Sequence, residues 1–181
     1  MKVLELFCGT KSVSNAFKTR GHEVFTVDWD KSFEPTLCAD IETLTAEDII
    51  RLCGGVPDVV WLSPDCTSYS IAAISHHREK KIDGNLAAKS EYAKKCDSVN
   101  MHIIDIVVNK IKPKYWFIEN PRGGFRKMNF VKSFPRYTVT YCQYGDTRMK
   151  PTDIFTNHPD PQFKPPCKNG DKCHSNRHSG N

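Results

Sequence analysis

The sequence has no long hydrophobic run, because no apolar stretch approaches the roughly 18 residues that a membrane-spanning helix requires. Near the N-terminus, Glu5 interrupts a short apolar segment and no small-residue cleavage site follows, so we expect no signal peptide. We therefore expect a cytoplasmic protein that does not associate with membranes. Its eight cysteines are then reduced thiols, available for chemistry or for metal binding.

The composition also lacks the signature of a disordered chain. Apolar residues make up 39% of the sequence and charged residues 26%, which is typical of a globular domain. The length of 181 residues is enough for one hydrophobic core without disulfide bonds. A net charge of +5 gives only a mild preference for polyanionic partners.

Glycine is scarce where a dinucleotide-binding motif would need it. A predicted strand, Lys2–Phe7, leads into a turn that contains only Gly9, and this argues against a dinucleotide oxidoreductase. We expect Ser12 to cap the helix that follows, and a second strand, Glu23–Trp29, closes on Asp28. This order is that of a nucleotide-binding βαβ unit, whose acid binds ribose hydroxyls. An ordinary βαβ unit with a solvent-facing Asp28 is the alternative.

Further apolar segments predict the other elements of an α/β fold. We expect strands at Val59–Leu62, Tyr115–Ile118, Tyr137–Cys142 and from Ile154, and helices after Thr45 and between Tyr92 and Ile111. Strands that alternate with helices favour a Rossmann-like fold, in which a mostly parallel sheet has helices on both faces. We expect one catalytic domain, residues 1–157, followed by a basic tail rich in Cys, His and Pro, residues 158–181.

One cysteine follows a predicted strand end. The strand Val59–Leu62 stops at Pro64, which has no backbone N–H to donate, and Cys66 comes two residues later. Open α/β sheets bind their ligands at the carboxyl ends of strands, so Cys66 is a candidate nucleophile. A small buried cysteine in a turn is the alternative. The basic cluster His76–Lys81 indicates either a solvated loop or a mobile loop that contacts phosphates.

The tail lacks the Cys-x2-Cys pair of familiar zinc sites. Cys167, Cys173 and His174, with His158 or His178 nearby, supply enough ligands for zinc, but their spacing is unfamiliar. We therefore predict no metal site, and we name Cys167, Cys173 and His174 as the ligands if a metal is bound.

Four motifs, in this order, resemble those of the cytosine-5 DNA methyltransferases. Leu6–Thr10 resembles the first motif of that family, Ser63–Cys66 with Ser70 its Pro-Cys nucleophile loop, Glu119-Asn120 its Glu-Asn motif, and Gln143–Gly145 with Arg148 its late Tyr-Gly motif. The resemblance covers residues 1–156. It implies a Rossmann-like, S-adenosylmethionine-dependent methyltransferase fold and methylation of carbon 5 of cytosine in DNA.

The resemblance also implies roles for the motif residues. Cys66 would add to carbon 6 of cytosine, Glu119 would bind and protonate the ring nitrogen, and Arg148 would hold the base or stabilise the thiolate. The cytosine must then be flipped out of the duplex or already single-stranded. The other implied substrate contacts are Ser63, Ser70, Asn120 and Lys150.

The implied cofactor is S-adenosylmethionine. The residues that the resemblance assigns to its binding are Phe7, Cys8, Gly9, Thr10, Asp28, Trp29, Asp40, Ile41 and Pro64. The backbone around Phe7 and Gly9 would hold the methionine end, and Asp28 the ribose hydroxyls. Trp29 would pack on the adenine and Asp40 would meet its amino group.

The chain departs from the family pattern in three places. Asp65 adds an acid beside the thiol, which tends to raise the thiol pKa unless Arg148 or DNA offsets it. The segment around Arg148 follows the late motif loosely, so Lys150 is an alternative counterpart. Nothing after Thr156 resembles a target-recognition domain, so we expect a minimal or truncated enzyme, or one that reads DNA through its tail, self-association or a partner. Such a chain suits a bacterial or phage protein.

Other functions stay open at this point. The same thiol and acid would serve an RNA cytosine methylase, or an enzyme that uses an altered sulfonium donor. A non-catalytic homologue that only binds S-adenosylmethionine or DNA is a different class. The presence of both Cys66 and Glu119 favours an enzyme, because binding alone needs neither residue.

Overall fold

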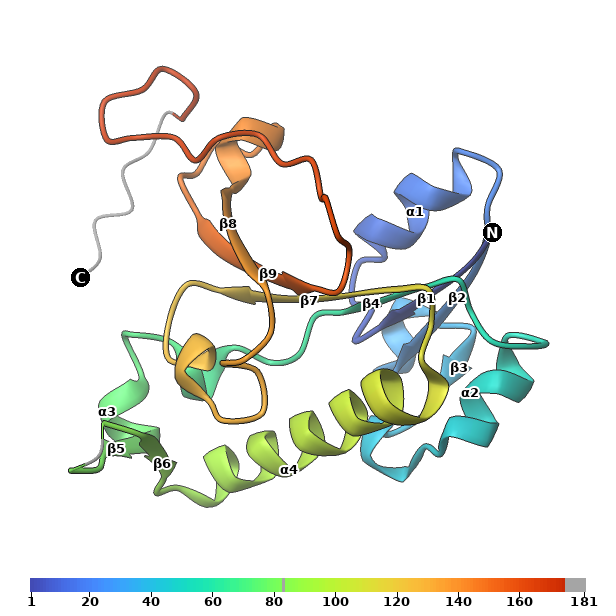
Figure 1. The fold of residues 1–181 in the computed structure, drawn as a ribbon, viewed down its shortest axis with the longest axis horizontal. Helices are drawn as coiled ribbons and strands as arrows, with labels where there is room; N and C mark the ends of the chain where they lie inside the picture. Colours follow the sequence, from blue (N-terminus) through green and yellow to red (C-terminus); the bar gives the residue numbers. More distant parts are fainter. Residues whose placement is uncertain (83, 175–181) are drawn as a thin grey trace. The chain divides into compact units, whose positions relative to one another are not determined.

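The computed structural model describes residues 1–82 and 84–174, which form two compact units (Figure 1). Unit 1 contains residues 1–64 and 95–118, and unit 2 contains residues 65–94 and those from 119 onward. Helix α4 and strand β7 each run along the chain from one unit into the other. The expected catalytic domain, residues 1–157, stays a prediction.

Unit 1 alternates strands with helices. Its elements are β1 (Lys2–Leu6), α1 (Ser12–Lys18), β2 (Glu23–Asp28), η1 (Lys31–Phe33), β3 (Leu37–Cys38), η2 (Ile41–Thr43), α2 (Ala46–Leu52), β4 (Val59–Leu62), most of α4 (Glu91–Asp105), its π-helical continuation η4 (Ile106–Ile111) and the first part of β7 (Tyr115–Pro121). The strands lie in the order β3-β2-β1-β4-β7 and pair in parallel. In Figure 1, α1 covers one face of these strands, while α2 and α4 cover the other. The predicted α/β layering, with a mostly parallel sheet and helices on both faces, is confirmed.

Strand β1 fixes the register of unit 1. Leu6 lies opposite Val27 on one side and opposite Leu62 on the other, and all three side chains are buried. The pairing continues past the strand ends, since Cys8 N–H donates to the Val27 carbonyl at 3.2 Å and Ser63 N–H donates to the Leu6 carbonyl at 3.3 Å. The segments that follow β1, β2 and β4 therefore leave the sheet from the same edge.

The start of α1 differs from the sequence prediction. Ser12 is the first residue of the helix and not its cap, because Lys11 precedes it in the left-handed conformation with φ 57°. The buried carboxylate of Glu5, on β1, accepts the Ser14 N–H at 2.8 Å and satisfies one amide of the first turn. In contrast, the predicted cap of α2 at Thr45 is confirmed, and Thr45 forms a capping box with Asp48.

Unit 2 is built from shorter elements. They are η3 (Thr67–Tyr69), α3 (Ile74–His77), β5 (Arg78–Lys80), β6 (Leu86–Ala88), η5 (Phe125–Lys127), β8 (Arg136–Thr140), η6 (Tyr141–Tyr144) and β9 (Pro151–Thr156), together with the start of α4 and the end of β7. Strand β9 lies between β7 and β8 and pairs with β8 in antiparallel fashion. The predicted strand Tyr137–Cys142 is wrong at its end, since β8 stops at Thr140, which lies opposite Pro151, and Tyr141–Tyr144 form a 3₁₀ helix.

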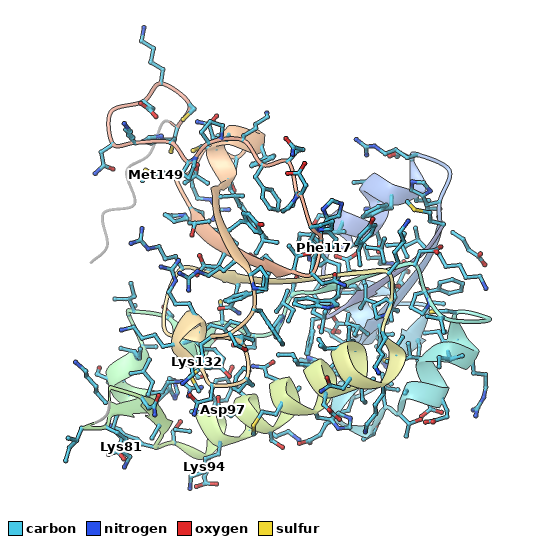
Figure 2. All side chains as sticks on the ribbon, viewed as in Figure 1. Lys81, Lys94, Asp97, Phe117, Lys132 and Met149 are labelled. Carbon is cyan, nitrogen blue, oxygen red and sulfur yellow. The ribbon has the colours of Figure 1, made fainter. Side chains whose placement is uncertain are left out.

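The basic cluster after Cys66 is structured. Residues 76–80 form the end of α3 and strand β5, which pairs with β6, so the predicted loop is wrong for these residues. Arg78 is buried, and its Nε and Nη2 donate to the carbonyl and hydroxyl of Ser68 at 2.9 and 3.0 Å. Its guanidinium lies 4.0 Å from the centre of the Tyr69 ring, a cation–π contact. Lys81 and Lys94, by contrast, extend outward (Figure 2).

None of the helices within residues 1–82 and 84–174 has the length and hydropathy of a membrane-spanning segment.

A buried ion pair gives a stability prediction for unit 2. Asp153, on β9, is 1% exposed and accepts from Arg126 Nε at 2.7 Å and from the Thr138 hydroxyl at 2.8 Å. Removing one member of a buried pair leaves the other charge uncompensated, so Asp153→Ala is expected to reduce the free energy of unfolding by about 3 kcal/mol. Asp105→Ala, which removes the exposed partner of Lys110, is the control and should change it little. Equal effects of the two substitutions in urea denaturation would contradict this assignment.

Candidate active site

Asp65, the residue before Cys66, holds the loop that carries the thiol. The Asp65 carboxylate accepts the Thr67 N–H at 2.6 Å and the Tyr92 hydroxyl at 2.7 Å. The first bond closes the turn that opens η3, and the second ties the loop to the start of α4. The acid that departs from the family pattern therefore has a structural role beside the thiol.

Two glycines after β7 approach the same loop closely. Gly124 N–H donates to the Tyr69 carbonyl at 2.7 Å. A Cβ on Gly123 would lie 2.6 Å from that carbonyl oxygen, so no larger residue fits without moving the loop. The Tyr69 ring packs edge-on against Phe125, with 5.0 Å between ring centres. Together these contacts fix the backbone on the C-terminal side of Cys66.

The thiol of Cys66 is half-buried, and its environment favours the protonated form. Burial raises the pKa of the Cys66 thiol most, and the negative charges of Asp65 and Glu119 raise it further. The positive charge of Lys150 lowers the pKa but does not cancel these effects. The surroundings of Cys66 therefore disfavour its thiolate.

The carboxyl of Glu119 lies at the end of β7 and is largely buried. Burial raises the pKa of Glu119, while the Tyr141 hydroxyl, which donates to its Oε1 at 2.7 Å, and the charge of Lys150 lower it. The net result is a raised pKa, as suits a carboxylic acid that donates a proton near neutral pH. Asn120, the next residue, is 1% exposed.

Arg148 and Lys150 have different surroundings. Arg148 is held by Asp146, with its Nε 3.2 Å from Oδ1 and its Nη2 3.0 Å from Oδ2. Lys150 Nζ lies 5.0 Å from the centre of the Tyr141 ring and acts on the charges of both Cys66 and Glu119. The structure thus brings Lys150 together with the thiol and the acid, whereas the Arg148 guanidinium is engaged by its own acidic partner.

The two candidate serines lie in different units. Ser63, in unit 1, accepts the Trp61 Nε1–H on its hydroxyl at 2.9 Å. Ser70, in unit 2, ends η3 and donates its N–H to the Thr67 carbonyl at 3.2 Å. Their substrate contacts stay a prediction.

The residues expected to bind the cofactor lie in unit 1, after β1, β2, β3 and β4. The Asp28 carboxylate accepts Gly9 N–H on Oδ2 and Asp30 N–H on Oδ1, both at 3.0 Å. Phe7 and Gly9 both have positive φ, 57° and 45°, so the first-motif loop turns sharply as it leaves the sheet. Asp28 therefore holds the loop against the end of β2.

The side chains at this edge differ in exposure. Trp29 is 73% exposed, which is unusual for the largest aromatic side chain, whereas Asp28, the residue before it, is only 6% exposed. Asp40 is exposed and its carboxylate accepts the Glu42 N–H at 3.0 Å, whereas Ile41 and Pro64 are buried. Burial raises the pKa of the Cys8 thiol to about 11, and the charges of Asp28 and Glu5 act in the same direction. Thr10 is exposed.

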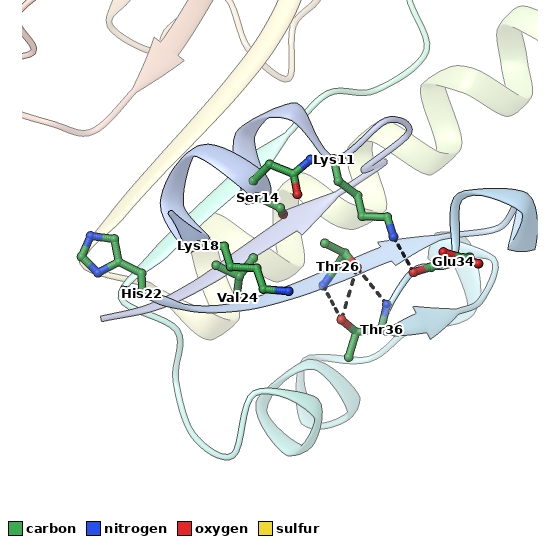
Figure 3. A pocket seen from close by; sticks show the side chains of 9 residues that line it. Lys11, Ser14, Lys18, His22, Val24, Thr26, Glu34 and Thr36 are labelled. Atoms are coloured by element: carbon green, nitrogen blue, oxygen red, sulfur yellow. Dashed lines mark hydrogen bonds between the residues drawn. The ribbon is translucent and has the colours of Figure 1, made fainter. Parts of the chain in front are cut away.

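A separate cavity of about 310 Å³ lies between α1, β2 and the segment before β3 (Figure 3). Lys11, whose Nζ donates to the Glu34 carbonyl at 2.7 Å, and the hydrogen-bonded pair Thr26 and Thr36 line it. None of the residues expected to bind the cofactor lines this cavity. We therefore assign it no part in cofactor binding.

The three expected metal ligands of the tail lie together. Cys167, Cys173 and His174 form one cluster, and Cys142 joins them from η6. His158 is not part of it; its Nδ1 accepts the Asp160 N–H at 3.2 Å. His178 lies outside the described residues.

Sequence reasoning missed Tyr141 and Cys142. Both were assigned to a strand, whose alternation gives no hint that Tyr141 reaches Glu119. Counting all cysteines with the tail residues would have offered Cys142 as a fourth ligand. It was missed because 25 residues separate it from Cys167, so no short spacing motif contains both.

The surroundings of Cys66 predict its reactivity. Lys150→Met should raise the thiol pKa, because a positive charge that favours the thiolate is lost, and should slow alkylation at neutral pH by a few-fold, whereas Arg148→Met should change the rate little. Alkylation of the Cys66 peptide by iodoacetamide is followed by mass spectrometry across a pH series, with the exposed Cys38 as internal reference. A larger effect of Arg148→Met than of Lys150→Met would contradict the geometry.

The chain is similar in sequence to one known protein and in fold to several solved structures. No family profile matches the chain. A Frog virus 3 (isolate Goorha) protein described as "Probable DNA (cytosine-5)-methyltransferase" is 29% identical over 150 residues, which are 81% of this chain and 65% of that protein. The S. pombe Dnmt2 methyltransferase matches with a TM-score of 0.57 at 15% identity, over 86% of this chain and 48% of its own. The Entamoeba histolytica methyltransferase EhMeth matches with a TM-score of 0.64 at 14% identity, over 90% and 56%.

The chain thus spans 65% of the length of its curated relative and about half of each of these two solved chains. The structural matches confirm the predicted Rossmann-like methyltransferase fold. In sequence and in fold the chain resembles the cytosine-5 DNA methyltransferases, and the resemblance that its motifs indicate is confirmed.

Proposed function

We propose that this protein transfers a methyl group from S-adenosylmethionine to carbon 5 of cytosine in DNA, through a covalent adduct with Cys66. The observation that carries the proposal is the grouping of a thiol, a buried carboxyl with a raised pKa and a lysine that acts on both: Cys66, Glu119 and Lys150. Two of these residues lie in motifs shared with cytosine-5 methyltransferases. The description of the frog virus relative favours DNA as the substrate.

The chemistry requires both a nucleophile and an acid. The Cys66 thiolate attacks carbon 6 of the ring, and the electron pair of the 5,6 double bond moves toward carbon 5 and the ring nitrogen. Burial raises the pKa of Glu119 and so favours its acid form, which donates its proton to that nitrogen and neutralises the developing charge. S-adenosylmethionine, when bound, would supply the methyl group to carbon 5, with its carbon–sulfur bond broken and a neutral thioether left behind. A base then takes the carbon 5 proton, the thiolate leaves carbon 6, and the ring nitrogen returns its proton to the Glu119 carboxylate, which restores the ring.

Lys150 and Tyr141 act on this pair against the dominant effect of burial. The positive charge of Lys150 favours the Cys66 thiolate, which has to form against the effect of burial. The Tyr141 hydroxyl donates to Glu119 Oε1, so it orients the carboxyl and leaves Oε2 as the atom for the proton. Assigning the role of the basic residue to Lys150, in place of Arg148, is part of the proposal.

The residues of unit 1 fit the cofactor. S-adenosylmethionine, when bound, supplies an electrophilic sulfonium methyl group. The exposed ring of Trp29 offers an aromatic surface for the adenine, and Asp28 beside it has carboxylate lone pairs for ribose hydroxyls. A Cβ on Gly9 would meet nothing within 4 Å, so the backbone there is open to a ligand. The target cytosine is expected to be flipped out or single-stranded, because stacking hides both faces of its ring.

The direct test traps the adduct. The protein is incubated with labelled S-adenosylmethionine and duplex DNA that contains 5-fluorocytosine. Fluorine replaces the proton that must leave carbon 5, so the reaction should stop as a covalent protein–DNA complex that carries the label. Wild type and the matched control Cys38→Ser should both form the complex on denaturing gels, whereas Cys66→Ser should form none.

The controls separate the alternatives. An RNA duplex with 5-fluorocytosine is run in parallel, and an adduct with RNA alone would overturn DNA as the substrate. An adduct that persists in Cys66→Ser would overturn the nucleophile. Binding of labelled donor by wild type, measured without nucleic acid, establishes that a missing adduct reflects absent chemistry and not an inactive preparation.

A further inference from the structure

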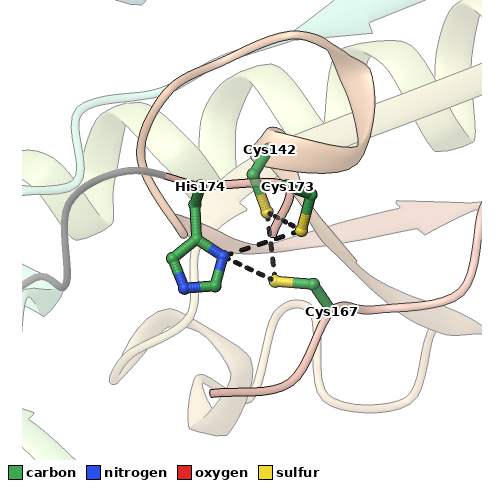
Figure 4. A group of neighbouring side chains, drawn as sticks. All are labelled: Cys142, Cys167, Cys173 and His174. Carbon is green, nitrogen blue, oxygen red and sulfur yellow. Dashed lines mark hydrogen bonds between the residues drawn. The ribbon is translucent and has the colours of Figure 1, made fainter. Parts of the chain in front are cut away.

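Four metal-ligating side chains converge in unit 2, outside the groups that act on cytosine. Cys142 lies in η6, directly after β8, and Cys167, Cys173 and His174 lie in the segment that follows β9. Their ligand atoms all lie within 4.8 Å of one another. Figure 4 shows the three sulfurs and the Nδ1 of the imidazole directed toward a common centre.

Three of the four separations below lie close to the edges of a tetrahedron around one ion, and the fourth, between Cys142 and Cys167, is shorter. A Zn–S bond of about 2.3 Å and a Zn–N bond of about 2.0 Å place tetrahedral ligand atoms roughly 3.5–3.8 Å apart. Cys142 Sγ lies 3.0 Å from Cys167 Sγ and 3.6 Å from Cys173 Sγ. His174 Nδ1 lies 3.8 Å from Cys167 Sγ and 3.6 Å from Cys173 Sγ. The sulfurs are too far apart for a disulfide, whose S–S bond is about 2.05 Å.

The groups around the ligands resemble the outer shell of a metal site. The Gln143 Nε2 amide lies 3.5 Å from Cys173 Sγ, and the Cys167 N–H donates to the Thr140 hydroxyl at 2.9 Å. The first contact places an N–H donor beside a ligand sulfur, and the second fixes the backbone of a ligand residue. Cys142 and Cys167 are buried, and Cys173 and His174 are half-buried, so the centre is shielded from solvent.

We propose that Cys142, Cys167, Cys173 and His174 bind one zinc ion. Three thiolates and one imidazole are a usual donor set for structural zinc, and four protein ligands leave no open position for a substrate. The site is therefore structural. It replaces the expectation of no metal, and it adds Cys142 to the three tail residues that the sequence offered.

The zinc ion joins the segment after β9 to the residues that follow β8. Cys142 is the immediate neighbour of Tyr141, whose hydroxyl donates to Glu119. Lys164 adds to the same connection, since its N–H donates to the Tyr144 hydroxyl at 2.8 Å and its Nζ to the Gln143 carbonyl at 2.7 Å. Fixing Cys142 therefore fixes η6, and with it the tyrosine that orients the acid.

The test measures metal content in the full-length protein, purified under reducing conditions without chelators. Elemental mass spectrometry should find one zinc per chain in wild type and in two controls, the exposed Cys38→Ser and the same-segment His158→Ala. Cys142→Ser and His174→Ala should lose most of the zinc. His174→Cys, which keeps four ligands, should retain it. Zinc content is measured without substrate, so it is independent of whether the protein methylates DNA.

A second readout separates metal ligation from misfolding. Cobalt exchanged into wild type should give the intense visible absorption of a tetrahedral ion and a near-ultraviolet thiolate band, with a stronger thiolate band in His174→Cys. A chelator should lower the unfolding temperature of wild type, because zinc binds the folded form. The proposal would be overturned if wild type holds no zinc and gives no cobalt bands, or if Cys142→Ser keeps its zinc. A Cys142–Cys167 disulfide in the purified protein would also overturn it.

Discussion

Parallel pairing of β1 with β2 and β4 is the constraint on which unit 1 depends. With Leu6 opposite both Val27 and Leu62, the loops that follow these strands leave the same edge of the sheet. Residues that are distant in sequence, such as Gly9 and Asp28, can then bond directly. A one-residue shift of the register would move the buried set to the other face, so the hydrophobic core of these strands also fixes the candidate cofactor site.

In unit 2, burial raises the pKa of both candidate reactive groups, which favours the proposed role of one and disfavours that of the other. Burial raises the pKa of Glu119 and so favours the acid form that the proposed reaction needs. Burial also raises the pKa of Cys66, which disfavours the thiolate that the same reaction needs. Lys150 favours the charged form of both groups, so it helps the nucleophile at some cost to the acid. This balance disfavours the thiolate in the free protein, so the proposed reaction would need bound substrate to stabilise it.

Much of this arrangement could be predicted from the sequence, for physical reasons that are visible in particular residues. Val59–Leu62 is a short apolar run, which predicts a buried strand. Pro64 ends the strand, so the chain must leave the sheet before Cys66. The same is true of the Thr45 cap, where local hydrogen bonding determines the structure. The Glu119 motif was recognised by its residues, and its placement at a strand end needed only the preceding apolar run.

The rest depends on contacts between residues far apart in the sequence. Glu5 replaces Ser12 as the helix cap because the sheet places a carboxylate under the first turn of α1. The sequence predicts Arg78 as a surface cation, but it is buried. Ser68 accepts hydrogen bonds from its guanidinium, and the Tyr69 ring stabilises the charge. Tyr141 and Cys142 leave the strand pattern where Pro151 ends the ladder, and only the folded chain shows that they meet Glu119 and the tail cysteines.

The identity of the product tests the central claim most directly. The protein is incubated with S-adenosylmethionine and a mixture of duplex DNA and RNA, which are then digested to nucleosides and analysed by mass spectrometry. The account predicts 5-methyl-2′-deoxycytidine with wild type. It predicts none with Glu119→Gln, because the amide keeps the size of the side chain but is too weak an acid to donate a proton near neutral pH. The appearance of 5-methylcytidine alone, or of no methylated nucleoside from folded protein that binds the donor, would contradict it.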